Sequence, residues 1–137
     1  MKIKLRGGVS LAEQISFYRQ LAVILRSGLP LLNALQLLQK HGSAKQMLLC
    51  YRLQQRLRRG SSLAQALAAE ADYGKQVTVA LVAVGEESGE LATLLEHLAD
   101  YYSRQLKLQR FVQRAVTYPA FLLLASVCVL LLFLLYI

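Results

Sequence analysis

The segment AVTYPAFLLLASVCVLLLFLLYI, residues 115–137, contains no charged side chain. As an α-helix it would extend for about 34 Å, at about 1.5 Å per residue, which is enough to cross a hydrocarbon core of roughly 30 Å. The residues before it include Arg104, Lys107, Arg110 and Arg114, and basic residues that flank a span tend to stay on the cytoplasmic side. The segment therefore predicts a membrane helix that is entered from the cytoplasm.

The charged residues all precede this segment: the 16 Lys and Arg and the 8 Asp and Glu give the soluble part a net charge of +8. Such a charge suits an anionic membrane surface, an acidic protein or nucleic acid. Direct nucleic-acid binding is disfavoured, because the basic residues are scattered and no nucleic-acid-binding motif is present. Cys50 and Cys128 lie on opposite sides of the predicted boundary without metal-ligand spacing, which indicates free thiols in a reducing compartment.

Residues 1–114 show helical periodicity and no sustained strand pattern. Capping boxes at Ser10–Glu13 and Ser62–Gln65 predict two helix starts. Glycine and proline positions divide the remainder, with Gly28 in a left-handed C-cap and Pro30 in the next first turn. The expected turn and kink residues are Gly28, Pro30, Gly60, Gly85, Gly89 and Pro119.

The pattern predicts an all-α fold: a six-helix antiparallel cytoplasmic bundle followed by one transmembrane helix. The fifth helix, about 75–85, is apolar almost all round and is expected to be the central buried element. The sixth is expected to run unbroken into the membrane, with a kink at Pro119. The expected organisation is a tail at 1–10, a cytoplasmic helical domain at 11–114 and a transmembrane helix at 115–137, the first of a longer chain.

No catalytic constellation is recognisable in the sequence. The chain lacks a GxxxxGK[ST] phosphate loop, and His41 lies at a helix end, where an imidazole interacts with the last carbonyls. His97 does not face its neighbour Glu96. We therefore expect no enzyme activity, no catalytic residue and no cofactor.

Three carboxylates, Glu86, Glu87 and Glu90, lie between and beside Gly85 and Gly89. One interpretation is a helix–turn–helix corner, in which Gly89 has a positive φ and Glu90 lies at the positive end of the next helix. The other adds a docking surface for a basic partner. Both remain open from the sequence.

Glu96 and Asp100 share a helix face at i, i+4, where a hard cation such as calcium could bind if another helix supplied oxygens. Pairing with Arg104 or with a cation of another helix is the favoured alternative, and no metal is expected. Arg104, Lys107, Arg110, Arg114 and Tyr118 are predicted to contact the membrane interface. Tyr101 and Tyr102 are expected to lie near that interface too.

Three blocks carry a family resemblance: FYRQLAVILRSGLPLLNAL at 17–35, LRRGSSLAQAL at 57–67, and VGEESGEL at 84–91 followed by LADYY at 98–102 and Tyr118-Pro119. With them the chain resembles the type II secretion system F family, the inner-membrane platform proteins of type II secretion, type IV pilus and competence machines. The resemblance covers nearly the whole chain from Leu11. An aromatic–proline pair usual before the fifth helix is replaced by Asp72-Tyr73-Gly74-Lys75.

The resemblance implies a non-enzymatic platform in the bacterial inner membrane, with residues 1–114 in the cytoplasm. Such proteins couple a cytoplasmic assembly ATPase to prepilins or pseudopilins and other inner-membrane components, in protein secretion, pilus biogenesis or DNA uptake. Contact with membrane lipid and homo-oligomerisation are further expectations. A second six-helix domain and more membrane helices are implied beyond this half. The alternative is a membrane-tethered adaptor or regulatory domain that binds one soluble partner.

Overall fold

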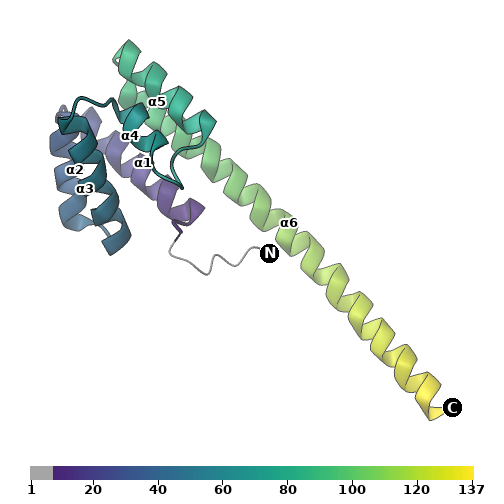
Figure 1. Cartoon of the computed structure of the whole chain (residues 1–137). Coiled ribbons are helices and arrows are strands. Elements are labelled where there is room, and N and C mark those ends of the chain that lie inside the picture. The colour runs from purple at the N-terminus through teal and green to yellow at the C-terminus, as the bar shows by residue number, and fades with distance from the viewer. Residues whose placement is uncertain (1–7) are drawn as a thin grey trace. The chain divides into compact units, whose positions relative to one another are not determined.

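The computed structural model describes residues 8–137 and confirms an all-α chain, with no strand in this range. The helices are α1 (Leu11–Arg26), α2 (Leu31–His41), α3 (Ala44–Arg58), α4 (Leu63–Ala68), α5 (Gln76–Ser88) and α6 (Leu91–Tyr136). Among these, α2 packs on α3, α4 on α5, α1 on α2 and α3 on α4 (Figure 1). The described chain divides after Ser103 into two compact units. The first of these is the expected helical bundle.

The predicted helix starts follow from local hydrogen bonds. The Ser10 hydroxyl accepts from the Glu13 amide at 3.2 Å, and the Glu13 carboxylate accepts from the Ser10 amide at 3.1 Å. The same reciprocal pair joins Ser62 and Gln65 at the start of α4. Each box satisfies amides that have no partner inside the helix.

Most of the expected turn residues lie at helix ends. Gly28, Gly60 and Gly89 have positive φ values of 95°, 98° and 76°. Pro30 is not inside the first turn of α2: it is the N-cap residue, and its carbonyl accepts from the Ala34 amide at 2.9 Å. Its ring still fixes φ at −60°, so it prepares the helix start from one position earlier.

The prediction that Gly85 is a turn residue is wrong. Gly85 lies inside α5, and it is buried. A Cβ there would lie 3.0 Å from Leu91 Cα and 3.1 Å from Leu94 Cβ, so the absence of a side chain allows the close approach of α5 to the first turns of α6. The chain reverses later, at Gly89, where the Glu90 amide returns to the Gly85 carbonyl at 3.0 Å and closes the helix.

The prediction that α5 is the central buried helix is also wrong. Val77 and Val84 are 42% and 53% exposed, and Thr78, Val82 and Gly85 are the buried residues of this helix. The reason is that α5 packs through one face only. Apolar composition all round does not reveal how many sides of a helix find neighbours.

The core is aromatic and is built mainly on α1. Phe17 and Tyr18 are fully buried, and their rings lie 5.5 Å and 5.8 Å from the ring of Tyr73. Tyr102 of α6 stacks on Tyr18 at 6.2 Å, and its hydroxyl lies 2.8 Å from Thr78 Oγ1. Tyr102 is therefore a core residue, which corrects its expected place at the membrane interface. Its neighbours bind the first turns of α6 into the bundle.

The single helix α6 runs from Leu91 to Tyr136 with Pro119 inside it, which confirms an unbroken passage from the bundle into the apolar segment. This is a helix long and apolar enough to cross a membrane. Pro119 has no N–H, so the carbonyl of Ala115 lacks its usual helical donor. A kink there stays a prediction.

Candidate functional site

The acidic corner at the end of α5 separates into two parts. Both carboxylate oxygens of Glu86 accept hydrogen bonds, from the amides of Leu63 and Ala64, each at 2.9 Å. Glu86 therefore caps the start of α4, where a negative charge meets unpaired amides and the positive end of the helix dipole. This corrects its expected place in a docking patch. Glu87 and Glu90 are exposed, and they are the part of the corner that faces solvent.

The two carboxylates considered as metal ligands are paired with arginines of α1. Both guanidinium nitrogens of Arg26 donate to Glu96, one of them at 2.7 Å, and Arg19 Nη1 lies 3.0 Å from Asp100 Oδ1. Among residues 8–137, no group of three or more His, Cys, Asp and Glu side chains is arranged to hold a metal ion. The favoured alternative of the sequence, a cation from another helix, is therefore correct. These pairs fasten the first turns of α6 to α1.

A further ionic cluster escaped the sequence analysis. Glu70, at the end of α4, is 8% exposed; its Oε1 accepts from Arg52 Nε at 2.8 Å and from Arg56 Nη1 at 2.7 Å, and its Oε2 accepts from Arg52 at 3.0 Å. Burial opposes the charge, but the two guanidinium groups outweigh it and hold the pKa of Glu70 below its ordinary value. The only hint of this ionic cluster in the sequence was the spacing of Arg52 and Arg56, at i and i+4 on α3. It did not identify the partner.

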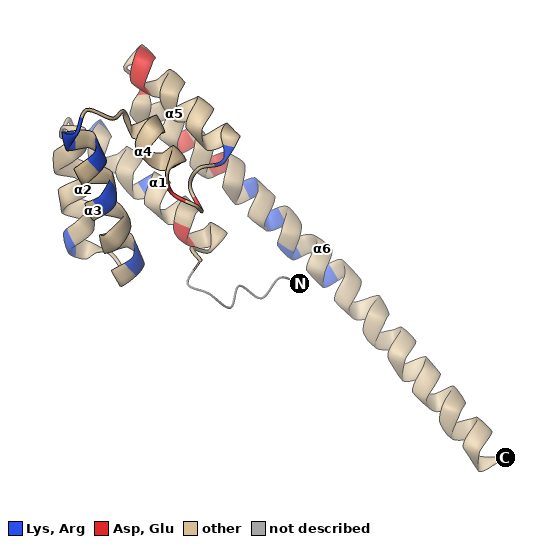
Figure 2. Cartoon of the chain, viewed as in Figure 1, with Lys and Arg blue, Asp and Glu red and all other residues tan. Residues whose placement is uncertain are grey.

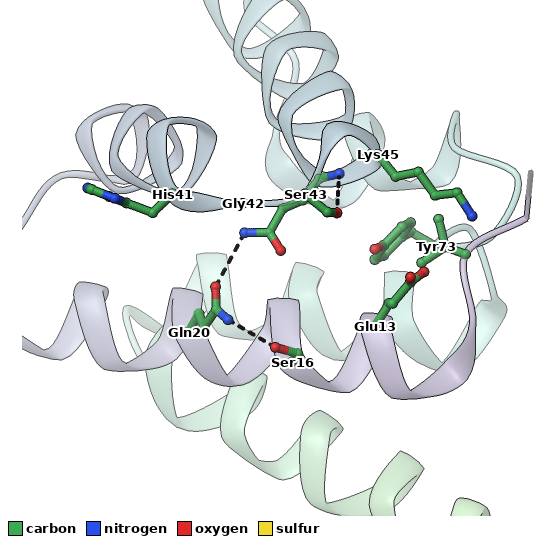
Figure 3. Close-up of a pocket in the computed structure, with 10 residues that line it drawn as sticks. Glu13, Ser16, Gln20, His41, Gly42, Ser43, Lys45 and Tyr73 are labelled. Carbon is green, nitrogen blue, oxygen red and sulfur yellow. Dashed lines mark hydrogen bonds between the residues drawn. The ribbon is translucent and has the colours of Figure 1, made fainter.

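A polar pocket of about 260 Å³ lies between α1 and the turn that joins α2 to α3 (Figure 3). At its floor Gln20 donates to Ser16 at 2.9 Å and accepts from Gln46 at 3.3 Å. Glu13, on one side, belongs to the capping box of α1, and Lys45 donates to the Gly8 carbonyl at 3.2 Å. The polar groups of this pocket hold local structure. His41 also lines it, at the end of α2.

A different recess, of about 550 Å³, lies along the contact between α1 and α2 and is almost entirely apolar. Its sides are Val23 and Ile24 of α1 and Leu37 and Leu38 of α2, and Arg19, Gln20 and His41 complete the lining. Val23 is 65% exposed and Leu37 39% exposed. An exposed apolar recess with a polar rim is typical of a protein contact surface.

The positive charge is not spread over the bundle. Residues 8–103 contain nine of the 16 Lys and Arg and all 8 Asp and Glu, so they are nearly neutral. Within residues 104–137 there are four basic residues, all before Ala115, and the blue segments of the ribbon in Figure 2 are accordingly confined to the first part of this stretch. These four residues are Arg104, Lys107, Arg110 and Arg114, which were expected at the membrane interface. They are exposed, and so is Tyr118.

The two cysteines differ in environment. Cys50 is fully buried, and burial raises the pKa of its thiol to about 12. Cys128 lies in the apolar part of α6 and is exposed. Both thiols are free, in agreement with the sequence analysis.

Comparison with known proteins places these features in a family. Residues 17–137 match the family model described as type II secretion system (T2SS), protein F. The type 4 fimbrial assembly protein PilC of Pseudomonas putida is 38% identical over 115 residues, which are 83% of this chain. The protein transport protein HofC homolog of Haemophilus influenzae is 36% identical over 92% of the chain, and type II secretion system protein F of Vibrio cholerae is 30% identical over 89%.

The chain spans only 29%, 31% and 30% of the lengths of these three relatives. The matched residues nevertheless include all three sequence blocks, the acidic corner and the whole of α6. Because the family model matches nearly the entire described chain, this chain belongs to the type II secretion system protein F family.

Proposed function

We propose that this chain is part of a non-enzymatic platform of a secretion or pilus machine, and that its bundle binds the cytoplasmic assembly ATPase of that machine. One observation carries the proposal: the family match extends without interruption from the bundle through α6, the helix long enough to cross a membrane. Residues 11–114 form the cytoplasmic domain in this proposal, and 115–137 the transmembrane helix in the bacterial inner membrane.

Coupling in this proposal depends on the start of α6. Leu95, Leu98 and Tyr102 are buried in the bundle, and Arg19 and Arg26 hold the same turns by ion pairs. A displacement of α1 would therefore act on the first turns of the helix that enters the membrane. Prepilins or pseudopilins and other membrane components are the proposed recipients of that displacement, in secretion, pilus assembly or DNA uptake.

The apolar recess of α1 and α2 is the surface that we assign to the ATPase. Hydrophobic recesses supply most of the affinity of a protein contact, whereas exposed charges mainly affect its rate and specificity. Glu87 and Glu90 form a second, acidic contact for a basic partner surface. The four basic residues and Tyr118 lie at the lipid headgroups in this proposal, where each cation contributes about 1 kcal/mol on an anionic surface.

The test uses the full chain in vesicles that contain anionic lipid, together with the assembly ATPase encoded in the same genome. Binding is measured by cosedimentation, and ATP turnover is measured with and without the chain. Val23→Glu and Leu37→Glu should each weaken binding by tenfold or more, on the order of 1.4 kcal/mol. Leu48→Glu is the matched control, because Leu48 is an exposed leucine of α3, 57% exposed, outside the recess. The proposal would be refuted if the unmodified chain did not cosediment with the ATPase and if its addition left the rate of ATP turnover unchanged.

A further inference from the structure

The charge of the bundle is small in sum but unevenly distributed. Between Glu13 and Glu70 the chain contains no acidic residue, and the ribbons of α2 and α3 in Figure 2 carry blue segments and no red ones. Two of these cations, Arg52 and Arg56, pair with Glu70. Four others are exposed and form no ion pair with a carboxylate of residues 8–137: Lys40, Lys45, Arg58 and Arg59.

The outer side of α3 is apolar as well as basic. Met47, Leu48 and Tyr51 are 44%, 57% and 52% exposed, whereas the opposite side of the same helix is buried in the bundle. At about 100° per residue, these three side chains lie within an arc of about 100°. Arg58 lies on the Met47 side of this arc, and Arg59 borders Leu48. An apolar strip that is edged by cations is typical of a helix that lies in a membrane interface.

The membrane segment keeps the bundle close to lipid headgroups. Tyr102 is the last buried residue of the bundle, and the uncharged segment begins thirteen residues later, at Ala115, after about 20 Å of helix. With residues 115–137 inserted, as in the proposed function, the bundle meets the membrane surface at the high effective concentration of a tethered group. A soluble acidic partner has no such advantage.

The pattern of the strip favours lipid over a protein segment as the occupant. A protein segment, whether of a partner or of a polypeptide as long as the curated relatives, would need carboxylates in register with cations on both edges of the strip. An anionic bilayer offers negative headgroups on every side of an apolar contact, so no register is needed. Tyr51 adds an amphipathic ring of the kind that is enriched at this boundary.

We propose that the outer face of α3 contacts the anionic lipid surface of the membrane that α6 crosses. Met47, Leu48 and Tyr51 lie at the boundary of headgroups and acyl chains, and the cations of this face, Lys45, Arg58 and Arg59, lie at the headgroups. The inference rests on the membrane insertion in the proposed function and adds a lipid contact separate from the basic stretch of α6. None of these residues lines the recess of α1 and α2, so one chain can contact lipid and the ATPase together.

Tryptophan quenching in vesicles tests this contact. The chain has no Trp, so one introduced tryptophan reports only its own surroundings. The full chain with Tyr51→Trp is placed in vesicles of phosphatidylglycerol and phosphatidylcholine, with bromine on the acyl chains of the phosphatidylcholine. Bromine quenches tryptophan on contact, and we expect several-fold more quenching for Tyr51→Trp than for the matched control Val84→Trp, at a residue of α5 that is 53% exposed. In vesicles of phosphatidylcholine alone, the Tyr51→Trp quenching should be lost.

A change of charge gives the second arm. In the Tyr51→Trp background, Arg59→Glu should reduce the quenching at least twofold, whereas Lys40→Glu, with the same change in net charge outside the outer face of α3, should leave it unchanged. Equal effects of the two substitutions would overturn the proposal, because net charge alone would then account for the contact. Equal quenching of Tyr51→Trp and Val84→Trp would overturn it too.

Two further outcomes identify what is wrong if the contact is absent. A blue-shifted Tyr51→Trp emission without bromine quenching would show that protein covers the strip, and would overturn the lipid contact. Phe121→Trp, in the apolar segment, reports the insertion of α6. Quenching of Phe121→Trp without quenching of Tyr51→Trp refutes the α3 contact alone, and absence of quenching in both refutes the membrane insertion of the proposed function as well.

Discussion

Replacing Glu70 with glutamine should destabilise the bundle, because this carboxylate is the shared acceptor of Arg52 and Arg56. Three charge-assisted hydrogen bonds, between 2.7 and 3.0 Å, end on its two oxygens. A hydrogen bond to a charged group contributes about 1.5–3 kcal/mol when it is buried. The Arg52 and Arg56 side chains are 46% and 31% exposed. Water can therefore hydrogen-bond to the guanidinium groups in the variant and offset part of the lost free energy. We expect Glu70→Gln to lower the free energy of unfolding by about 2 kcal/mol at pH 7.

The pH dependence gives this prediction a second, independent readout. The folded-state pKa of Glu70 is below its ordinary value, so the unfolded chain binds this proton more readily than the folded chain does. The stabilisation is therefore fully present above the unfolded pKa of about 4.3 and is lost as the pH falls through the folded pKa. The difference in unfolding free energy between the native chain and Glu70→Gln should narrow as the pH falls below about 4.3.

The assay is urea unfolding of the full chain in a nonionic detergent, followed by tyrosine fluorescence at pH 7 and at lower pH values. The chain has 7 Tyr and no Trp, and the buried tyrosines Tyr18, Tyr73 and Tyr102 report on the core. Glu87→Gln is the matched control, since Glu87 is exposed and should change the unfolding free energy little. A loss below about 0.5 kcal/mol for Glu70→Gln, within the range of ordinary surface substitutions, or a difference that does not change with pH, would refute the reasoning.

Three further changes test other parts of the structure. Gly89→Val should destabilise the fold by about 1 kcal/mol or more, because Gly89 has a left-handed φ of 76°. Gly89→Asn should destabilise it less. Equal urea midpoints for the native chain and the two variants would contradict the left-handed turn. Glu86→Gln should destabilise the fold by about 1 kcal/mol because it caps α4 more weakly. The double variant Glu87→Lys, Glu90→Lys should keep the fold and weaken ATPase cosedimentation. Loss of the fold in the double variant but not in Glu86→Gln would show that Glu87 and Glu90 have the structural role. In the Cys128→Ala chain, Cys50 should not react with a thiol reagent at pH 8 until urea unfolds the bundle, because the pKa of its thiol is raised to about 12; rapid modification of the folded chain would show that the thiol is accessible.

Local signals in the sequence predicted the helices well. The capping boxes at Ser10 and Ser62 and the glycines at positions 28, 60 and 89 act over a few residues, and their hydrogen bonds and backbone angles do not depend on the rest of the chain. The apolar run of α6 was equally clear, since a membrane helix is identified by length and composition. These features account for the correct number and order of helices.

Packing and long-range pairing were not predictable in the same way. The residues of α5 are apolar on every side, so only the tertiary arrangement shows that Val77 and Val84 remain exposed. Gly85 was interpreted as a turn because glycine more often ends a helix than permits a close approach to a neighbouring one. Glu70 meets Arg52 and Arg56 across 18 and 14 positions, and no periodicity connects such partners.

Most of the acidic residues have partners inside the bundle, and for this reason they were misleading as indications of a functional site. Glu70, Glu96 and Asp100 pair with arginines of other helices, and Glu86 caps α4. Each of these charges stabilises the bundle and is thereby withdrawn from a partner, since a group that is already hydrogen-bonded gains little by exchanging one acceptor or donor for another. The apolar recess at Val23 and Leu37 is then the larger surface left for recognition beside Glu87 and Glu90, and four of the cations lie on α6 beyond the bundle. A nearly neutral bundle should consequently recognise its partner chiefly by shape and apolar contact, while the four basic residues of α6 act where the chain meets the anionic membrane surface.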